Sequence, residues 1–584
     1  MTSLVVATVV RGGERLDSLR SIFARRHPLV AVALFVLGAL VMQRHAVAHL
    51  GTTISGNGVA DQTQFMWAMW WWPHAILHGL NPFVTHEIWV PDAFNLGSVT
   101  STPLPALVLA PLTALVGPVH GPIVSYNVAN LLVPIIGAWF AYRLCFYLTR
   151  APAASILGGW LYGFSSYGLG QLQAHLNLVF TFAPPVMALL TIQLYRGDIR
   201  RRRFAALGAA TLACQALCGT EILFTGTVMG AVALFCALCF APREDRYSVV
   251  ALIPPLMAAY LLAGVICSPF FWYALTGPTL APGQGINLPA DLLSFVIPTP
   301  MTWLGGRSFW SVSASYLGNT AEDGTYLGLP LIAIAIAYWS ESFRKPATKV
   351  LMAATLVAAV WSLGVLLTID GHRIISLPFK LLASQKLFNE VMPVRIGMYT
   401  ALGTAIAAAG WVAAPGSFRW RRWLLGLLAV VFLFPNANSV KPTGQRIFDE
   451  AYRSPTFITD GLYRHYLRPG EVVLPVPFGP VGASLLWQAQ ARGYFRLASG
   501  WFGYYPPSYL TSPVVGQLSD FGPFTDPVRQ TRSFLISHRV GAVVILPGQS
   551  GPWPRVMSQL GLKPMSVGGV WLYRVPRGLK VAST

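Results

Sequence analysis

The residue best placed for acid–base chemistry is Asp61, in the stretch Gly58-Val-Ala-Asp61-Gln-Thr-Gln-Phe-Met-Trp67. It follows the first long apolar segment, so its carboxylate should lie where the chain leaves the membrane. A carboxylate held there can take a proton from a hydroxyl group, as a general base does. Asp is also a favoured helix N-cap, so Asp61 could instead cap a predicted helix over 62–79. The two roles are compatible, and we predict that Asp61 is catalytic.

Other ionisable residues lie close to the ends of predicted membrane spans. Glu87 and Asp92 share a loop with Asp61 and would orient hydroxyl groups or bind a cation, or they are solvated loop acids. His175 and Glu221 lie at span junctions, where an ionisable residue is a functional candidate by default. A polar loop residue is the alternative for His175, and a helix cap is the alternative for Glu221.

One predicted outside loop, 369–395, is rich in basic residues. Arg373, Lys380, Lys386 and Arg395 lie in it, and a phosphate group is the natural ligand for such a set. Arg395 is the best candidate because a guanidinium can hold a phosphate through paired N–H groups, whereas a lysine acts as a point charge. Contact with anionic lipid headgroups is the alternative.

The long loop 273–324 carries Glu322 and Asp323, which are candidates to contact a substrate if this loop closes over it. We predict no metal site, because Asp61, Glu87 and Asp92 alone do not form a recognisable set of ligands. A divalent cation is left open as a cofactor.

Membrane helices must position these residues. The 584 residues are 54% hydrophobic and only 11% charged, and apolar runs of about 17–25 residues, enough to cross a bilayer as a helix, recur along the chain. A shorter apolar stretch, 103–117, is predicted either to dip into the membrane or lie on it, or to cross it. The predicted spans are 29–47, 122–145, 152–168, 177–195, 204–219, 222–241, 248–272, 325–340, 349–368, 396–414 and 423–437.

Helix 62–79, which follows Asp61, carries Trp67, Trp70, Trp71 and Trp72. Tryptophan gathers at the boundary between membrane and water. We therefore predict that this helix lies in the interface with its tryptophans as anchors. Stacking of a tryptophan ring on a sugar is the alternative.

The distribution of Lys and Arg predicts the orientation, because these residues gather on the cytoplasmic side. Residues 49–121 contain none of them, whereas the tract 196–203 contains five arginines. About half of the basic residues act as such anchors, so the formal net charge of +20 does not indicate nucleic acid as a partner. The N-terminus is predicted inside, and the predicted outside segments are 49–121, about 168–176, 273–324, 369–395 and everything after about 437.

Three regions follow from this pattern: a cytoplasmic segment 1–27, a membrane domain 28–437 with its outside loop 49–121, and an outside domain 438–584. In the last region, segments 471–477, 540–546 and 569–574 have strand composition between Pro and Gly turns, which predicts a small α/β domain. All six cysteines fall in predicted spans, so we expect neither a disulfide framework nor a zinc site.

Several chemistries lack their sequence signals. The chain has no Walker loop, no Gly-x-Gly-x-x-Gly after a strand, no serine nucleophile elbow and no His-Glu-x-x-His helix. The cytoplasmic loops are also mostly under about ten residues, which leaves no room for a nucleotide-binding domain. Chemistry at the outer membrane face or transport remains.

The residues resemble the integral-membrane glycosyltransferases of the GT-C superfamily. The resemblance rests on Asp61-Gln-Thr-Gln-Phe-Met-Trp67, Asn81-Pro-Phe83, His175-Leu-Asn-Leu178, Tyr326-Leu-Gly328 after Glu322, and Pro393-Val-Arg395. It covers about residues 25–415. One departure is Ala60, where we expect glycine before the acid.

The resemblance implies a polytopic α-helical protein of the GT-C type in the bacterial plasma membrane, with about 11 spans, interfacial helices and a small C-terminal α/β domain. It implies an inverting hexosyl- or pentosyltransferase that moves a sugar from a polyprenyl-phosphate carrier to a lipid, glycan or protein acceptor. Asp61 would be the base. The competing interpretations are a transporter or lipid-handling protein without catalysis, although no internal repeat supports one, and a scaffold that acts through its C-terminal domain.

Overall fold

The computed structural model describes residues 26–278, 288–305, 308–385, 388, 391–441, 444–520, 522–549 and 551–578. Nearly all of the predicted cytoplasmic segment 1–27 and the predicted phosphate ligand Lys386 lie outside the described residues.

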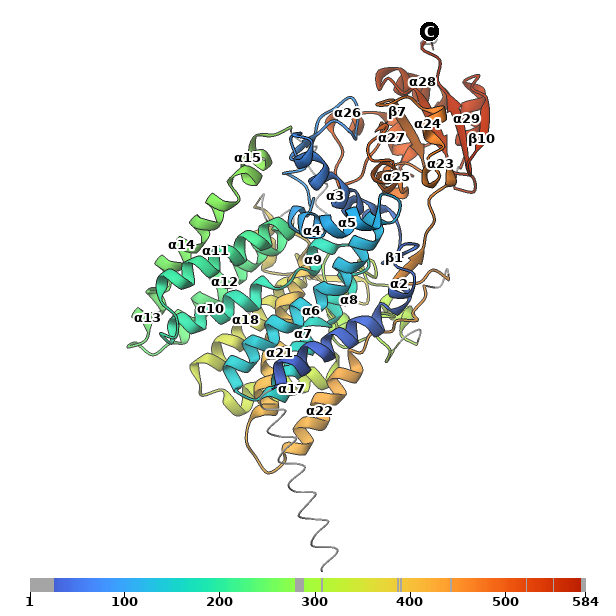
Figure 1. Cartoon of the computed structure of the whole chain (residues 1–584). Coiled ribbons are helices and arrows are strands. Elements are labelled where there is room, and N and C mark those ends of the chain that lie inside the picture. Colours follow the sequence, from blue (N-terminus) through green and yellow to red (C-terminus); the bar gives the residue numbers. More distant parts are fainter. Residues whose placement is uncertain are drawn as a thin grey trace, which may run out of the picture.

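A bundle of apolar helices makes up most of the chain (Figure 1). Several helices begin with proline in their first turn, where the missing N–H costs no hydrogen bond. The bundle comprises Arg26–Met42, α2 (Arg44–Ala48), α6 (Gly121–Thr149), α7 (Pro152–Gly163), α8 (Ser166–Gln171), α9 (Leu176–Val179), α10 (Ala183–Tyr195), α11 (Arg201–Cys218), α12 (Thr220–Phe240), α13 (Arg246–Val250), α14 (Ile253–Ile266), α15 (Ser268–Thr276), α17 (Gly328–Ser342), α18 (Pro346–Ser362), η2 (Pro393–Ile396), α21 (Gly397–Ala413) and α22 (Arg419–Phe432).

Glycines on α7 allow its neighbours to approach closely. A Cβ atom at Gly163 would lie 2.4 Å from the Cβ of Ala138 on α6, and one at Gly158 would lie 2.7 Å from the sulfur of Cys145. Small residues at helix crossings are typical of membrane bundles, because packing and not water exclusion holds such helices together. This packing fixes α6 and α7 beneath the loops that carry the candidate site.

Five helical segments in the described part of the chain are long and apolar enough to cross a membrane: Gly121–Thr149, Leu176–Tyr195, Thr220–Phe240, Arg246–Ile266 and Pro393–Ala413. Helices also coincide with the other predicted spans, but they are shorter, broken or, in α11, less apolar because three arginines open the helix, so the count of about 11 spans stays a prediction. The prediction of a helix over 349–368 is wrong at its end. Gly364 adopts φ +74°, a conformation that ends a helix, and Leu366–Ile369 forms strand β4.

Strand β4 pairs with β5 (His372–Ser376) in a hairpin, close to the short helices η1 (Leu292–Phe295), α16 (Trp310–Ser313) and α19 (Phe379–Ala383). The first outside loop contains β1 (Thr53–Ser55), α3 (Ala60–Leu77), β2 (Val84–Thr85), β3 (Phe94–Asn95), α4 (Pro103–Val108) and α5 (Ala110–Val116). The stretch 103–117 thus forms two helices of six and seven residues. At 1.5 Å per residue, neither helix alone is long enough to cross a bilayer.

The C-terminal residues form a five-stranded sheet in the order β10-β11-β9-β7-β8, with β7 parallel to β8 and β9. The strands predicted at 471–477, 540–546 and 569–574 are confirmed as β7 (Val472–Val476), β9 (Ala542–Ile545) and β11 (Val570–Arg574). Both β7 and β9 are buried along their whole length, as strands covered on both faces are. The other elements are β6 (Asp449–Ala451), α23 (Thr456–Thr459), α24 (Tyr463–Tyr466), η3 (Gly479–Val481), α25 (Ser484–Gln490), β8 (Arg496–Leu497), α26 (Pro507–Leu510), α27 (Pro513–Leu518), α28 (Pro527–Ser537), α29 (Trp553–Gln559) and β10 (Pro564–Val567).

The first outside loop is joined to the C-terminal domain by backbone hydrogen bonds. Strand β1 pairs with β6. Beside β8, the N–H of Leu497 donates to the carbonyl of Glu87 at 2.9 Å, and the N–H of Val90 donates to the carbonyl of Leu497 at 3.0 Å. Residues 87–90 therefore extend the sheet at its β8 edge.

The tryptophans of α3 pack inside the protein. Trp67, Trp71 and Trp72 are buried, and Trp67 and Trp71 share a hydrophobic core with the C-terminal sheet. The indole N–H of Trp67 donates to Gln488 on α25 at 2.7 Å. The prediction that these side chains anchor the helix in lipid headgroups is therefore wrong. Amphipathic aromatic rings suit a protein interface as well as a membrane one, and the sequence alone does not distinguish them.

Candidate functional site

Asp61 lies in the first turn of α3, and a C-terminal residue holds its carboxylate. The indole N–H of Trp501 donates to Asp61 Oδ1 at 2.6 Å. The N-cap of α3 is Val59, so Asp61 does not occupy the capping position that sequence allowed. Asp61 is partly exposed, and among the described residues no group donates a hydrogen bond to its second carboxylate oxygen.

Three of the predicted residues meet in an ion-pair cluster. Arg395, in η2, donates from Nη2 to Glu322 Oε1 at 2.6 Å and from Nη1 to Glu221 Oε2 at 2.6 Å. Its Nε contacts both oxygens of Glu322 at 3.2 Å. The side chains of Arg395 and Glu322 are 11% and 2% exposed, so lipid headgroups do not surround this guanidinium. A guanidinium has five N–H donors, and these bonds leave one N–H on each terminal nitrogen.

His175 joins the cluster through Gln171. The Nε2 group of Gln171 donates to Glu322 Oε2 at 3.0 Å and to the carbonyl of Ala321 at 3.2 Å, so its Oε1 is the acceptor for Nδ1 of His175 at 2.8 Å. The network thereby assigns the proton of a neutral His175 to Nδ1. Its Nε2 then carries a lone pair that can accept a hydrogen bond.

Burial and neighbouring charges, respectively, lower the pKa of His175 and of Glu322. Burial lowers the pKa of His175, although the nearby carboxylates of Glu322 and Asp61 act in the opposite direction. Burial alone would raise the pKa of Glu322, but the positive charge of Arg395 and the hydrogen bonds from Arg395 and Gln171 lower it to about 2. Gln62, next to Asp61 on α3, donates to the carbonyl of Gln173 at 2.6 Å, which brings the start of α3 to the segment that carries His175.

Close backbone approach brings the loop of Glu322 onto α8. A Cβ atom at Gly170 would lie 2.4 Å from the carbonyl oxygen of Ala321, and one at Gly324 would lie 2.8 Å from the Cα of Tyr167. Asn319 fixes the loop by accepting from the N–H groups of Ala321 and Glu322. Glycine is required at both close approaches.

Comparison with solved structures identifies the architecture. The arabinofuranosyltransferase AftD from Mycobacteria aligns with 95% of this chain at a TM-score of 0.57 and 15% identity, and this chain spans only 40% of the length of AftD. The oligosaccharyltransferase AglB from Archaeoglobus fulgidus aligns with 95% of this chain and 75% of its own at a TM-score of 0.51 and 11% identity. The chain has the fold of the GT-C membrane glycosyltransferases. No protein-family model and no curated protein sequence matches it.

In this GT-C fold, Glu87 and Asp92 face the C-terminal domain and do not contact the cluster around Arg395. Burial raises the pKa of Glu87, and the positive charge of Arg496 offsets part of this increase. Asp92 accepts a hydrogen bond from Ser508.

Arg373 and Lys380, the other predicted phosphate ligands, are exposed on β5 and α19. They lie outside the network of hydrogen bonds around Arg395. Among the described residues, no group of three or more His, Cys, Asp or Glu side chains is arranged to hold a metal ion, and we assign no step to one.

Sequence reasoning missed three residues that fix elements around the candidate site. Gln171 lies four residues before His175, so helical spacing beside a polar junction could have indicated it. Trp501 carries no such signal, because 440 residues separate it from Asp61. Asp291 is buried and accepts from the N–H groups of Leu293 and Gly371 at 2.9 Å, which ties the β4–β5 hairpin to η1.

Proposed function

We propose that this chain is a membrane glycosyltransferase that moves a sugar from a polyprenyl-phosphate carrier to a hydroxyl group of a lipid, glycan or protein acceptor at the extracytoplasmic face. The GT-C fold supports this proposal, and the AglB structure contains a dolichol-phosphate and an inhibitory peptide. One observation carries it: the start of α3, where Trp501 orients Asp61, is hydrogen-bonded to the segment before His175, because Gln62 donates to the carbonyl of Gln173 at 2.6 Å. This combination offers a base and a set of fixed N–H donors for one reaction.

Asp61 is the proposed general base. Trp501 occupies Oδ1, so Oδ2 can accept the proton of the acceptor hydroxyl as its oxygen attacks the anomeric carbon of the donor. The bond between that carbon and the phosphate oxygen breaks, and the polyprenyl phosphate leaves with the additional negative charge. Attack opposite the leaving group inverts the configuration of the sugar.

Arg395 is the proposed partner of the leaving phosphate, through the two N–H groups that the carboxylates leave free. Glu221 and Glu322 fix the plane of the guanidinium, so it need not reorganise when charge develops on the phosphate. His175, with its lone pair on Nε2, is proposed to accept a hydrogen bond from a substrate hydroxyl. Glu87, Asp92, Arg373 and Lys380 are proposed to act farther out, on the path of the substrates.

A transfer assay in membranes tests the proposal. The full chain is expressed and supplied with radiolabelled polyprenyl-phospho-sugars, and wild type is compared with Asp61→Asn. We expect the loss of the base to slow transfer by roughly a hundredfold to ten-thousandfold. Asp460→Asn is the matched control, because Asp460 is exposed in the C-terminal domain and makes only a local bond with Thr459.

Equal product from wild type and Asp61→Asn would remove Asp61 as the base. Binding or movement of the carrier lipid without any product from wild type would favour a transporter or lipid-handling protein. If deletion of about 440–584 abolishes the cellular function while Asp61→Asn preserves it, a scaffold becomes the better explanation.

A further inference from the structure

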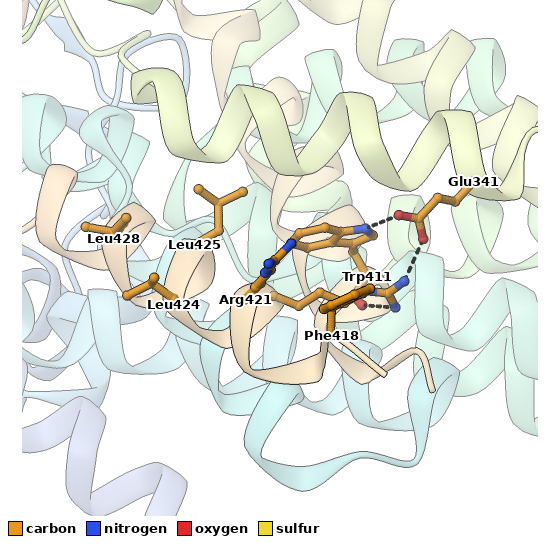
Figure 2. A pocket seen from close by; sticks show the side chains of 8 residues that line it. Glu341, Trp411, Phe418, Arg421, Leu424, Leu425 and Leu428 are labelled. Atoms are coloured by element: carbon orange, nitrogen blue, oxygen red, sulfur yellow. Dashed lines mark hydrogen bonds and ion pairs between the residues drawn. The ribbon is translucent and has the colours of Figure 1, made fainter. Parts of the chain in front are cut away.

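A cavity of about 460 Å³ lies where α17 and α21 end and α22 begins (Figure 2). In Figure 1, the C-terminal end of α17 and the N-terminal end of α22 lie at the opposite end of the bundle from the C-terminal sheet. The cavity is therefore remote from Asp61 and Arg395, and the proposed transferase site makes no use of it.

Two adjacent arginines line the cavity and differ in their partners. Arg422 is hydrogen-bonded within the protein. It donates to Glu341 at 2.8 Å and to the carbonyls of Trp411 and Ala414 at 3.1 Å. Glu341 also accepts from the indole N–H of Trp411 at 2.9 Å. The carboxylate of Glu341 is thus neutralised and does not repel an anion.

Arg421 packs against aromatic rings instead. Its guanidinium lies over the rings of Phe418 and Trp420, at 4.5 and 5.4 Å from their centroids. Among the described residues, no carboxylate, carbonyl or hydroxyl oxygen accepts a hydrogen bond from its side chain. The aromatic faces hold the cation in place and leave its donors available, and a planar guanidinium matches the geometry of a phosphate group.

The wall beside Arg421 is apolar. Leu424, Leu425 and Leu428 line it, and in Figure 2 they lie on the other side of Arg421 from Glu341. Arg421 and Leu428 are seven residues apart on α22, which is about 10 Å along the helix axis. This apolar path leads from the charged end of α22 toward the middle of the bundle.

We infer that this cavity binds an anionic glycerophospholipid, with its phosphate on Arg421 and an acyl chain along the three leucines. A soluble phosphate would gain from the guanidinium but not from the leucine wall. A lipid presents its phosphate at the membrane surface and its acyl chain inward, and the cavity has the same arrangement of charge and apolar surface. This site is separate from the carrier lipid of the proposed reaction.

Native mass spectrometry of the full chain in detergent tests the site, with phosphatidylglycerol as the probe and phosphatidylcholine as its zwitterionic counterpart. Arg421→Gln is compared with Arg419→Gln, which removes the same charge from an exposed residue of α22 that does not line the cavity. We expect Arg421→Gln to weaken phosphatidylglycerol binding roughly fivefold and Arg419→Gln to leave it unchanged. Leu424→Asn should also weaken it, through the apolar wall.

Equal affinity in the two arginine variants would overturn the inference, because binding would then depend only on net charge. Full competition by an excess of inorganic phosphate would overturn the assignment to a lipid. Both arginines are exposed, so neither variant should impair folding, and the melting temperature of each variant verifies this.

Discussion

Trp501 donates its indole N–H to Asp61 at 2.6 Å across 440 residues of chain. A residue of the C-terminal domain thus orients the carboxylate proposed as the catalytic base. Hydrogen bonds to charged groups contribute about 1.5–3 kcal/mol, enough to fix one conformation of a side chain.

The first prediction concerns this bond. Trp501→Phe keeps an aromatic ring but removes the donor, so we expect kcat to fall by roughly tenfold to a hundredfold with little change in KM. Trp272→Phe, at an exposed tryptophan, should leave both constants unchanged. An unaltered kcat for Trp501→Phe would show that Asp61 needs no such support.

The second prediction concerns Arg395. Its replacement by Met leaves the buried carboxylate of Glu322 and the partly buried carboxylate of Glu221 without their cation, and we expect a loss of about 3–5 kcal/mol in the free energy of unfolding. Arg395→Lys keeps the charge without the paired donors, so its free energy of unfolding should lie between those of wild type and Arg395→Met. The melting temperature reports both effects. Arg373→Met, at an exposed arginine, is the control, and an equal shift there would contradict the assigned role of the cluster.

The third prediction is a pH dependence. Burial lowers the pKa of His175 from 6.5, so the unfolded chain binds a proton here more readily than the folded one. This contribution to stability is fully present above pH 6.5 and is lost as the pH falls through the folded pKa. In His175→Gln, the melting temperature should therefore fall less between pH 7 and pH 5 than in wild type. Parallel curves would show that His175 does not titrate in this range.

The fourth prediction concerns the contact between α3 and the C-terminal domain. Trp67→Ala removes a fully buried ring and its bond to Gln488, and should cost about 3–5 kcal/mol. Limited proteolysis should then cut the C-terminal domain faster. Leu77→Ala on the same helix is the control, because Leu77 is 81% exposed. Equal cleavage rates would mean that this interface adds little to stability.

Local patterns in the sequence predicted much of the fold. Apolar runs indicated helices such as α6 and α12, and strand composition indicated β7, β9 and β11. The turn at Gly364 that ends α18 could not be predicted in this way, because glycine is also common inside membrane helices.

The site was predicted less completely. Asp61, His175, Glu221, Glu322 and Arg395 were proposed one by one, because ionisable residues at span ends are conspicuous. That Arg395 joins Glu221 and Glu322, and that Trp501 contacts Asp61, depends on contacts between distant segments. Periodicity along the chain carries no information on such contacts.

Residues 87–90 complete the β8 edge of a sheet whose own strands begin at Val472. This segment and Trp67 are translated long before their partners, so on the predicted topology both lie on the outer face without them until the C-terminal domain has crossed the membrane. During that interval the tryptophans of α3 lack their protein cover. On the predicted topology, translocation of the C-terminal domain also encloses α3 and brings Trp501 to Asp61, so we expect the proposed transferase to be inactive until this domain has crossed the membrane.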